Sequence, residues 1–418
     1  MIVTLKPKKP GGAVTDVIAS KSMAHRVLIC AALADSPTEI ECNSSSLDIM
    51  ATIGALRSLG AGIEIRGNIF RVQPIADIPE GRVTVNCGES GSTLRFILPV
   101  IGALGVKADV TGSGRLGKRP LSPLIEELTA HRMTCMSDTQ TGFPLVCDGK
   151  LKGSSYTIDG GVSSQFVTGL MFALAASGGG KIKVTGRLES RPYVDLTVAV
   201  LREFGVSIEE KGGIFNIAAG EIHSPGRMRI EGDWSNGAFW LAMGALSGEG
   251  VSVSPLNVGS VQGDREVYPL LEKFGADVKI SGETVTVRRK SLSGTDFDAS
   301  DIPDLVPVLS VVAAAAEGTT VIRGVTRLRL KESDRIKSVC DMLTALGVTA
   351  EADDEKITIE GGHIRGGTVD SQNDHRIAMA AAVASAEADG DITIVGAEAV
   401  EKSYPDFFDK MKELYNNN

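Results

Sequence analysis

Apolar, alanine-rich segments alternate along the whole chain with short stretches in which apolar and polar residues alternate. Val27 to Ala34 and Leu305 to Ala316 are apolar on nearly every helical face, which predicts helices that are buried on all sides. Ile63–Arg66 and Lys181–Thr185 alternate with period two, which predicts strands with one exposed face. The pattern therefore indicates an α/β protein with its helices inside and its sheets outside.

One phrase recurs along the sequence at a spacing of roughly 70 residues, as in a repeat protein. In this phrase a helix ends at Leu-x-x-Φ-Gly, where Φ is apolar, and two strands joined by a tight turn follow. Copies begin near Leu56, Leu201, Leu271 and Met342, and a weaker copy covers Ile125 to His131. The last helix, Phe407 to Tyr415, corresponds to a copy that is truncated before its strands. We therefore expect six units, each with about two helices and four short strands.

Each predicted buried helix follows a polar junction. The junctions are rich in Ser, Thr, Asn and Asp, which cap helix N-termini. The free N–H groups and the dipole of a helix N-terminus attract anions. The six junctions are Lys21-Ser22, Glu89–Arg95, Ser163–Gln165, Asp233–Asn236, Asp301–Asp304 and Asn373–Arg376. If the units are related by symmetry, these helix starts converge and form a local anion pocket.

The first junction shows most clearly what such a site offers. Ser20 or Ser22 is a candidate N-cap, and Ser22 and Arg26 are four residues apart on one helix face. Lys21 lies at the start of the same turn. A hydroxyl group, two cations and free N–H groups suit a phosphate or a carboxylate. The alternative is a capped helix with two solvated cations, and the recurrence of the arrangement favours the anion site.

Composition restricts the class of protein. The chain has 418 residues, 43% of them hydrophobic and 23% charged, and a formal net charge of −9. Such a charge argues against nucleic acid or an anionic membrane as the main partner. The six cysteines form no CxxC pair and no zinc-ligand spacing, so we expect free thiols in a reducing compartment. No apolar run has the length of a signal peptide or of a bilayer span, so we expect a cytoplasmic protein.

Two further basic stretches need an interpretation. Gly112–Lys118 nearly matches a phosphate-binding P-loop, but Arg119 stands where that loop needs a Ser or Thr hydroxyl for magnesium. We therefore interpret it as a loop that presents cations, followed by a helix that starts at Pro120. Leu330–Arg335 is expected to begin another helix, with Lys331 and Arg335 on one face. An ordinary surface helix would explain this second stretch equally well.

Taken in order, these motifs resemble one known family over the full length of the chain, the EPSP synthases (3-phosphoshikimate 1-carboxyvinyltransferases). The matching motifs are Lys21-Ser22 with Arg26, Gly91 with Arg95, Arg119-Pro120, Ser163–Gln165, Ser190–Tyr193, Ile302–Asp304, Lys331–Arg335, Asp374–Arg376 and Lys402. Any single motif is common, whereas nine of them in order are specific.

The resemblance implies a fold, a reaction and a domain division. It implies a two-domain inside-out α/β barrel with six βαβαββ repeats, three per domain. Residues 1–19 and 231–418 would form the first, discontinuous domain and residues 20–230 the second, with the active site in the cleft between them. The reaction would transfer the enolpyruvyl group of phosphoenolpyruvate to the 5-hydroxyl of shikimate 3-phosphate. No cofactor and no metal would be needed, and we expect a monomer whose partners are these two substrates.

The resemblance also assigns residues. Shikimate 3-phosphate would be bound by Lys21, Ser22, Arg26, Ser163, Ser164, Gln165, Ser190, Tyr193, Asp304 and Lys331. Phosphoenolpyruvate would be bound by Lys21, Gly91, Arg119, Gln165, Arg335, His375, Arg376 and Lys402. Such a cationic pocket suits two phosphates and two carboxylates. Asp304 would receive the proton of the 5-hydroxyl, and Glu332 with Lys21 and Lys402 would deliver a proton to the methylene carbon.

Two positions depart from the family pattern, and three alternatives stay open. Arg327 and Glu89 stand where the family often has Asn, which leaves a substrate contact of Arg327 open. The related UDP-N-acetylglucosamine enolpyruvyltransferases typically have Lys-Asn in place of Lys21-Ser22 and a cysteine near Arg119. A P-loop phosphotransferase built on Gly112–Lys118 and a non-catalytic repeat scaffold are the other two alternatives.

Overall fold

A strand–helix–strand–helix–strand–strand unit recurs along the chain. Its most regular copy consists of β18 (Asp296–Asp298), α9 (Val306–Ala315), β19 (Thr319–Arg323), α10 (Arg335–Ala345), β20 (Thr349–Ala352) and β21 (Lys356–Glu360). β18 and β19 pair in parallel, and β21 pairs antiparallel with both β19 and β20. This copy has the two helices and four strands that the repeated phrase predicts.

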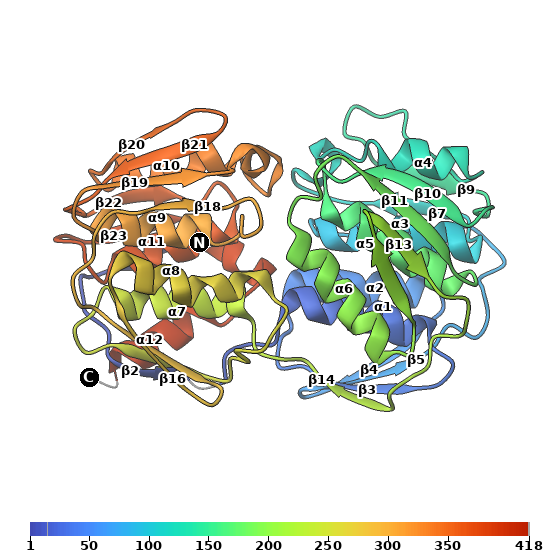
Figure 1. The fold of residues 1–418 in the computed structure, drawn as a ribbon, viewed down its shortest axis with the longest axis horizontal. Helices are drawn as coiled ribbons and strands as arrows, with labels where there is room; N and C mark the ends of the chain where they lie inside the picture. The colour runs from blue at the N-terminus through green and yellow to red at the C-terminus, as the bar shows by residue number, and fades with distance from the viewer. Residues whose placement is uncertain (15, 417–418) are drawn as a thin grey trace. The chain divides into compact units, whose positions relative to one another are not determined.

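The copies are divided between two compact units (Figure 1). The computed structural model describes residues 1–14 and 16–416. Unit 1 is Met1–Ser20 with Glu231–Asn418, and unit 2 is Lys21–Ile230. The chain thus leaves unit 1 after Ser20 and returns to it after Ile230. Between these points it builds the whole of unit 2.

Unit 2 has three four-stranded sheets among its described residues. Their strand orders are β14-β3-β5-β4, β6-β7-β9-β8 and β10-β11-β13-β12. The first sheet consists of β14 (Arg227–Arg229), β3 (Thr38–Glu41), β5 (Ile69–Gln73) and β4 (Gly62–Arg66). The second consists of β6 (Val83–Asn86), β7 (Ala108–Thr111), β9 (Leu145–Asp148) and β8 (Thr134–Met136). The third consists of β10 (Ser155–Asp159), β11 (Gly180–Thr185), β13 (Ile214–Ile217) and β12 (Ile208–Lys211).

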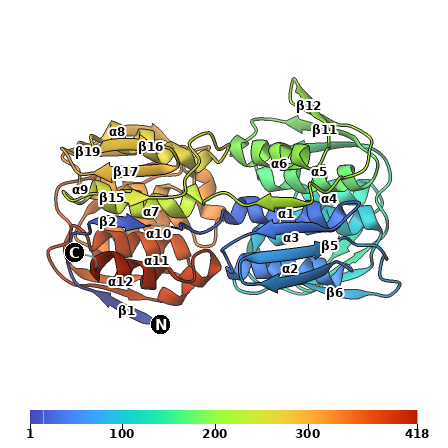
Figure 2. The same ribbon diagram turned by 90° about the horizontal axis from the view of Figure 1, so that it is seen from below.

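Unit 1 also has three sheets within the described part of the chain, and N-terminal strands complete two of them. One sheet is formed by β18 to β21. Another consists of β16 (Asp277–Ser281), β17 (Thr284–Arg288), β15 (Val251–Val253) and β2 (Gly12–Val14), and Figure 2 shows β2 beside β15. The third consists of β1 (Ile2–Leu5), β23 (Ile392–Val395) and β22 (Gly367–Asp370). Because β1 pairs antiparallel with β23, it takes the place of one of the two strands that the truncated last copy lacks, and this sheet has three strands.

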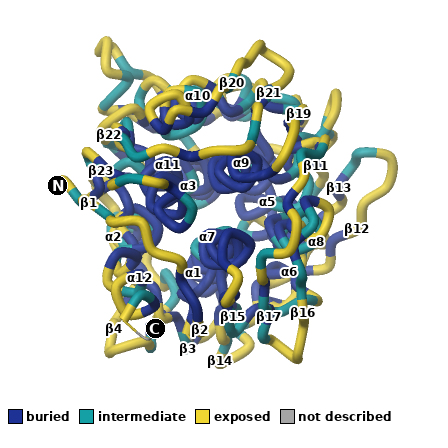
Figure 3. Tube along the Cα trace, turned by 90° about the vertical axis from the view of Figure 1, so that its left-hand side faces the viewer, coloured by how far each residue is buried: buried dark blue, intermediate teal, exposed yellow. Residues whose placement is uncertain are grey.

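The apolar helices lie inside each unit, as their sequences predict (Figure 3). The inner helices of unit 1 are α7 (Trp234–Ala245), α9 and α11 (His375–Ala384), and those of unit 2 are α1 (Lys21–Leu33), α3 (Gly91–Leu104) and α5 (Ser164–Ala176). Small residues let them pack closely, since a Cβ added to Gly169 of α5 would lie 2.4 Å from the carbonyl oxygen of Arg95 in α3. Helices with exposed residues surround them, namely α2 (Leu47–Ser58), α4 (Leu124–Ala130), α6 (Arg191–Glu203), α8 (Val267–Phe274), α10 and α12 (Phe407–Asn416).

Two helix starts differ from the sequence prediction. The helix expected at Pro120 is α4, which begins at Leu124, because Ser122 precedes Pro123 and the residue before a proline disfavours the helical conformation. The helix expected to include Lys331 is α10, which begins at Arg335. Its N-cap is Asp334, whose carboxylate accepts a hydrogen bond from the Lys337 N–H at 3.2 Å. Lys331 and Arg335 therefore do not share a helix face.

Candidate active site

The residues that the sequence predicts to bind substrate fall into two clusters, one in each unit. The unit 1 cluster is Asp304, Lys331, Glu332, Arg335, His375, Arg376 and Lys402. The unit 2 cluster is Lys21, Ser22, Arg26, Gly91, Arg119, Ser163, Ser164, Gln165, Ser190 and Tyr193. Most of these residues lie at or just before the N-termini of helices, where N–H groups are available to anions.

Asp304 lies at the centre of the unit 1 cluster, just before the buried helix α9. Its two carboxylate oxygens accept hydrogen bonds from Arg335 Nη1 at 2.7 Å and from Arg376 Nη2 at 2.9 Å, and Lys331 Nζ is 3.5 Å away. Burial by itself would raise the pKa of Asp304, but the three cations outweigh it and hold the pKa well below its usual value of 3.8. Asp304 is therefore ionised at neutral pH.

Arg335 connects Asp304 to a second buried carboxylate, that of Asp374. The Arg335 side chain is 1% exposed, and it donates from Nε to Asp374 at 2.8 Å and from Nη2 to Glu332 at 2.8 Å. Although burial lowers the pKa of this guanidinium, the surrounding carboxylates raise it well above its usual value. Asp374 also caps α11 by accepting a hydrogen bond from the Arg376 N–H at 3.0 Å. The sequence analysis gave Asp374 no role, although its position as a capping Asp between Asn373 and His375 was a usable signal.

Lys331 and Asp264 have pKa values that are shifted toward neutral pH. Burial lowers the pKa of Lys331 to about 8, although Asp304 acts in the opposite direction. Asp264 lies in the 3-10 helix η2 (Gly263–Glu266) and accepts a hydrogen bond from the Ser235 hydroxyl at 2.5 Å. Burial, and then the negative charge of Asp304, raise the pKa of Asp264 to about 6. The sequence analysis did not select Asp264, because nothing local distinguishes it from a loop carboxylate.

Lys402 completes the unit 1 cluster and belongs to the last repeat, which also carries His375 and Arg376. It ends the 3-10 helix η4 (Ala397–Lys402) and is 7% exposed. Its ammonium group donates a hydrogen bond to the carbonyl oxygen of Asn373 at 2.6 Å. The backbone of Asn373 adopts a left-handed conformation with φ of 57°, which turns the chain immediately before α11. Lys402 is thereby fixed beside the junction that carries His375 and Arg376.

In the unit 2 cluster, Lys21 is the first residue of α1 and is paired with Asp48. The distance between Lys21 Nζ and Asp48 Oδ2 is 2.7 Å, and each side chain is 14% exposed. Asp48 lies in the first turn of α2, where a carboxylate is favoured by the helix dipole. The sequence analysis did not find Asp48, since nothing in the sequence indicates that the first turns of α1 and α2 meet. Asp48 holds the ammonium group of Lys21 in place at the helix start.

Arg26 positions two neighbouring segments of the unit 2 cluster. Its guanidinium is buried and donates hydrogen bonds to the Ser22 and Tyr193 carbonyl oxygens, both at 2.7 Å, and to the Thr197 hydroxyl at 2.8 Å. Burial lowers the pKa of Arg26 to about 9, which still leaves it charged at neutral pH. Tyr193 follows Ser190, whose φ of 52° places it in the left-handed region at the start of α6. Arg26 therefore ties the start of α1 to the start of α6.

Gln165 belongs to the first turn of α5, and Arg119 lies in space beside Gly91, the first residue of α3. Ser163 caps α5 by accepting a hydrogen bond from the Gln165 N–H at 3.3 Å. The amide oxygen of Gln165 accepts a hydrogen bond from Arg95 Nη1 at 2.7 Å. The Arg119 guanidinium lies against Gly91, because a Cβ added to Gly91 would lie 2.5 Å from Arg119 Nη1. Arg95 belongs to the Gly91 motif, but the sequence analysis gave it no binding role.

The remaining glycine motif does not form a P-loop. Gly112–Arg115 is followed by the three-residue 3-10 helix η1 (Leu116–Lys118) and not by an α-helix. The phosphate-binding loop of a P-loop enzyme needs the N-terminus of a true helix. The stretch instead forms a loop that carries Arg115, Lys118 and Arg119, as the missing hydroxyl predicts.

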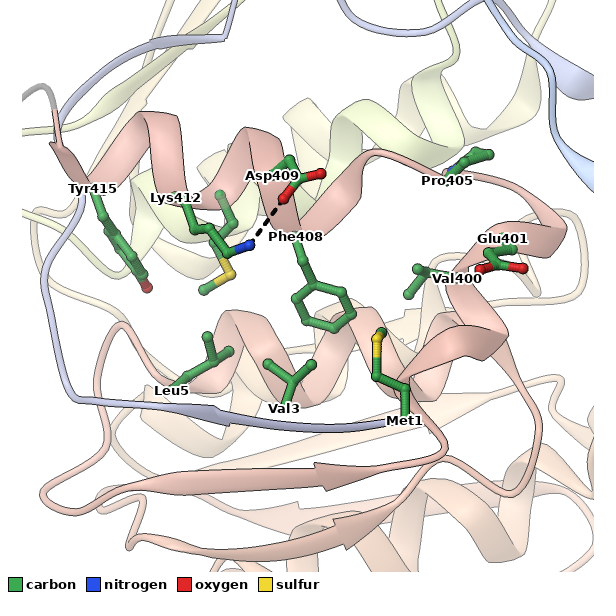
Figure 4. A pocket seen from close by; sticks show the side chains of 11 residues that line it. Met1, Val3, Leu5, Val400, Glu401, Pro405, Phe408, Asp409, Lys412 and Tyr415 are labelled. Atoms are coloured by element: carbon green, nitrogen blue, oxygen red, sulfur yellow. Dashed lines mark hydrogen bonds and ion pairs between the residues drawn. The ribbon is translucent and has the colours of Figure 1, made fainter.

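A pocket of about 240 Å³ in unit 1 lies outside the unit 1 cluster (Figure 4). It lies between β1, η4 and α12, and its lining includes Val3, Val400, Phe408, Met411 and Tyr415. Figure 4 shows Lys412 paired with Asp409 at its rim, at a distance of 2.9 Å. None of the predicted substrate-binding residues lines this pocket, so it does not belong to the candidate active site.

The geometry defines an α/β protein in which cations and hydroxyls gather at helix N-termini and an ionised carboxylate lies among the cations. Within residues 1–14 and 16–416, no helix has the length and apolar character needed to cross a bilayer. The model of the EPSP synthase (3-phosphoshikimate 1-carboxyvinyltransferase) family matches residues 6–411. The chain belongs to this family, and it is therefore a transferase.

Relatives with assigned names agree with the family match. The 3-phosphoshikimate 1-carboxyvinyltransferase of Clostridium kluyveri is 39% identical over 99% of this chain and 97% of its own length. That of Clostridioides difficile is also 39% identical, over 98% of this chain and 96% of its own length. Among solved structures, an EPSP synthase from Acinetobacter baumannii has a TM-score of 0.79 and is 25% identical, over 99% of this chain and 98% of its own. The fold class and the family that the sequence predicts are thus confirmed.

Proposed function

We propose that this chain transfers the enolpyruvyl group of phosphoenolpyruvate to the 5-hydroxyl of shikimate 3-phosphate, with release of phosphate. This is the reaction of the shikimate pathway that the names of its relatives describe. The observation that carries the proposal is the concentration of cations and hydroxyls at helix N-termini in a chain of net charge −9. Two substrates with two phosphates and two carboxylates between them require such a concentration.

In this proposal each substrate is bound by its own set of residues, and each set draws on both clusters. Ser163, Ser164 and Ser190 offer hydroxyls and helix N-termini to the phosphate of shikimate 3-phosphate. Arg119, which lies against Gly91, and Lys402 bind phosphoenolpyruvate. The other binding residues are assigned to the two substrates as the resemblance to the family implies. Both substrates take residues from unit 1 and from unit 2, so we propose that the two clusters meet on the bound substrates.

Asp304 acts as the base for the 5-hydroxyl. In the structure Arg376, Lys331 and Arg335 hold the pKa of Asp304 low, and a low pKa makes a weak base. The anionic groups of the substrates compete for the same three cations. Their binding raises the pKa of Asp304 toward the range in which it accepts a proton well. The proposed base is therefore activated by the substrates themselves.

The reaction is an addition followed by an elimination. The 5-oxygen attacks the C2 atom of phosphoenolpyruvate, the 5-hydroxyl proton goes to Asp304, and the methylene carbon gains a proton from Glu332 with Lys21 and Lys402. The tetrahedral intermediate then loses phosphate, and a proton leaves the new methyl group to restore the double bond. Glu332 is held at 2.8 Å by Arg335, the same guanidinium that binds Asp304. This pairing is suited to keeping the acid and the base in a fixed relationship.

The decisive experiment measures phosphate release with shikimate 3-phosphate and phosphoenolpyruvate, omitting each in turn. We expect phosphate only when both are present, a product with the mass of 5-enolpyruvylshikimate 3-phosphate, and no effect of EDTA. Phosphate release with UDP-N-acetylglucosamine as the acceptor would instead favour the related enolpyruvyltransferase. A requirement for ATP and magnesium would favour a phosphotransferase. Absence of any thermal shift with shikimate 3-phosphate would favour a non-catalytic scaffold.

A further inference from the structure

Two cysteines that are 12 residues apart in the sequence face each other in unit 2. Cys135 lies in β8 and Cys147 in β9, and the two residues are direct partners in the antiparallel register of these strands. Their sulfur atoms are 2.9 Å apart, and both side chains are buried. All six cysteines of the chain are free thiols in this structure. Nothing in the sequence distinguishes this pair from the other four.

The backbone around this pair already has the geometry of a disulfide. Directly opposed residues in an antiparallel pair have Cα atoms about 4.5–5.5 Å apart. Disulfide-bonded cysteines have Cα atoms about 4.4–6.8 Å apart. A bond between the two sulfur atoms therefore needs no change in strand register and only a small movement of the side chains.

We propose that Cys135 and Cys147 are a modification site, at which a small disulfide oxidant such as oxidised glutathione forms a reversible intramolecular disulfide. The Cys135 thiolate attacks one sulfur of the oxidant and releases one glutathione as a thiol. The Cys147 sulfur then attacks the Cys135 sulfur of this mixed disulfide and releases the second glutathione. Two thiol groups of the protein are oxidised, the oxidant is reduced to two thiols, and the two protons pass to these thiols.

Strand position explains why Cys135 is the residue that attacks the oxidant first. β8 is the outer strand of the sheet β6-β7-β9-β8, and its neighbouring residue Met136 is 67% exposed. An edge strand opens locally at lower free energy than a central one. Cys147 lies in the inner strand, where its hydrogen bond with Cys135 and then burial raise the pKa of its thiol far above the usual value. Cys147 therefore acts second, once the mixed disulfide is within contact.

The disulfide would close a loop that supports the Arg119 region. The loop between β8 and β9 packs directly on the Gly112–Lys118 loop, since a Cβ added to Gly117 would lie 1.9 Å from the carbonyl oxygen of Thr141. A Cβ added to Gly142 would lie 2.8 Å from the carbonyl oxygen of Gly117. A disulfide that closes the loop from Cys135 to Cys147 lowers the conformational entropy of the unfolded chain. We therefore expect the melting temperature of the oxidised protein to be about 5 °C or more above that of the reduced one. The inference does not depend on the proposed function.

The test uses the full-length protein, reduced with dithiothreitol, freed of reductant and then incubated with oxidised glutathione. After denaturation and alkylation, we expect four of the six cysteines to be modified and a disulfide-linked peptide that contains residues 135 and 147. The rise in melting temperature should disappear when dithiothreitol is added back. Six alkylated cysteines, a stable glutathione adduct, or a link to a different cysteine would overturn the proposal.

Matched variants separate this pair from the other thiols. Cys340→Ser changes a half-buried cysteine in unit 1 and should leave both the linked peptide and the thermal shift intact. Cys135→Ala and Cys147→Ala should each abolish both readouts, with far-ultraviolet circular dichroism as the check on folding. If either alanine variant does not fold, the peptide map of the wild-type protein still decides the question. A thermal shift that persists in a folded Cys135→Ala variant would also overturn the proposal.

Discussion

Asp304 Oδ1 lies 2.7 Å from Arg335 Nη1, and this contact joins the start of one buried helix to the start of an outer helix in the same repeat. Arg335 is 1% exposed, and Asp374 and Glu332 occupy its other donors. The pair therefore has no freedom to separate unless another anion replaces a carboxylate. Phosphate and carboxylate groups of substrates are such anions, which makes this contact the centre of the proposed site.

Asp304→Asn should separate binding from chemistry. The amide keeps the shape of the side chain and one hydrogen-bond acceptor for Arg335 or Arg376, but it cannot accept a proton. We expect shikimate 3-phosphate affinity within about tenfold of wild type and a kcat lowered about 10²–10⁴-fold. Titration calorimetry and phosphate release measure the two quantities. A kcat close to that of wild type would show that Asp304 is not the base.

Arg119→Ala and Lys402→Ala should weaken phosphoenolpyruvate binding selectively. Each variant removes a charge-assisted contact worth about 1.5–3 kcal/mol, which corresponds to a KM for phosphoenolpyruvate raised about tenfold or more. Lys118→Ala is the matched control, because Lys118 is an exposed cation of the same loop as Arg119. The control should leave both KM values near those of wild type. Equal weakening of both substrates would contradict the proposed division of the site.

Gly91→Ala should act through Arg119. The added methyl carbon would lie 2.5 Å from Arg119 Nη1, and the guanidinium, at the end of a flexible side chain, can move away without unfolding the protein. We expect a nearly unchanged melting temperature and a KM for phosphoenolpyruvate that is raised about tenfold or more. Gly54→Ala is the control, because a methyl group there meets nothing within 4 Å. A large loss of stability in Gly91→Ala would show that the glycine serves packing instead.

Asp264→Asn should stabilise the protein increasingly as the pH rises. Folding raises the pKa of this carboxyl from 3.8 to about 6, so the folded state holds the proton more tightly than the unfolded state. The stabilisation of the folded state by this proton is fully present below pH 3.8 and is lost between about pH 4 and pH 6, as the carboxyl group ionises. Above pH 6 the buried carboxylate costs up to about 3 kcal/mol, since one pKa unit equals about 1.36 kcal/mol.

Urea unfolding at about pH 4.5 and about pH 7 tests this expectation. The difference in the free energy of unfolding between Asp264→Asn and wild type should grow with pH, because the amide does not ionise and can still accept a hydrogen bond from Ser235. Asp391→Asn, which changes an exposed carboxylate of the same unit, is the control variant. A constant difference for Asp264→Asn would mean that Asp264 ionises normally in the folded protein.

Shikimate 3-phosphate should draw the two units together. The proposed ligands include Ser163 and Ser190 of unit 2 and Asp304 of unit 1, so in this proposal one bound molecule contacts both units. A bridging anion has a differential affinity for the closed state, which is the condition for a ligand to shift a conformational equilibrium. The radius of gyration from small-angle scattering should fall at saturating shikimate 3-phosphate. Shikimate without its phosphate is the control and should have little effect at the same concentration.

Local features of the site were predictable because they depend on sequence neighbours. Ser163, Asp233 and Asp374 stand at helix starts because their short polar side chains accept hydrogen bonds from N–H groups two or three residues later. The start of α10 was predicted wrongly because Asp334 caps the helix, by accepting a hydrogen bond from the Lys337 N–H, and the helix therefore begins after Lys331. The predicted helix included Lys331, four residues before the true start at Arg335, which is an error of about one helical turn.

The sequence by itself determined the repeat, the buried helices and the family, because apolar periodicity, capping residues and turn glycines act over a few residues. Only the tertiary structure decided which charged groups meet. The pairing of Lys21 with Asp48, of Arg335 with Asp374, and of Cys135 with Cys147 spans 12 to 39 residues. Such contacts depend on strand register and on the packing of one helix start against another. Burial then fixes the pKa values of these groups, and burial is a property of the packed chain that no local pattern specifies.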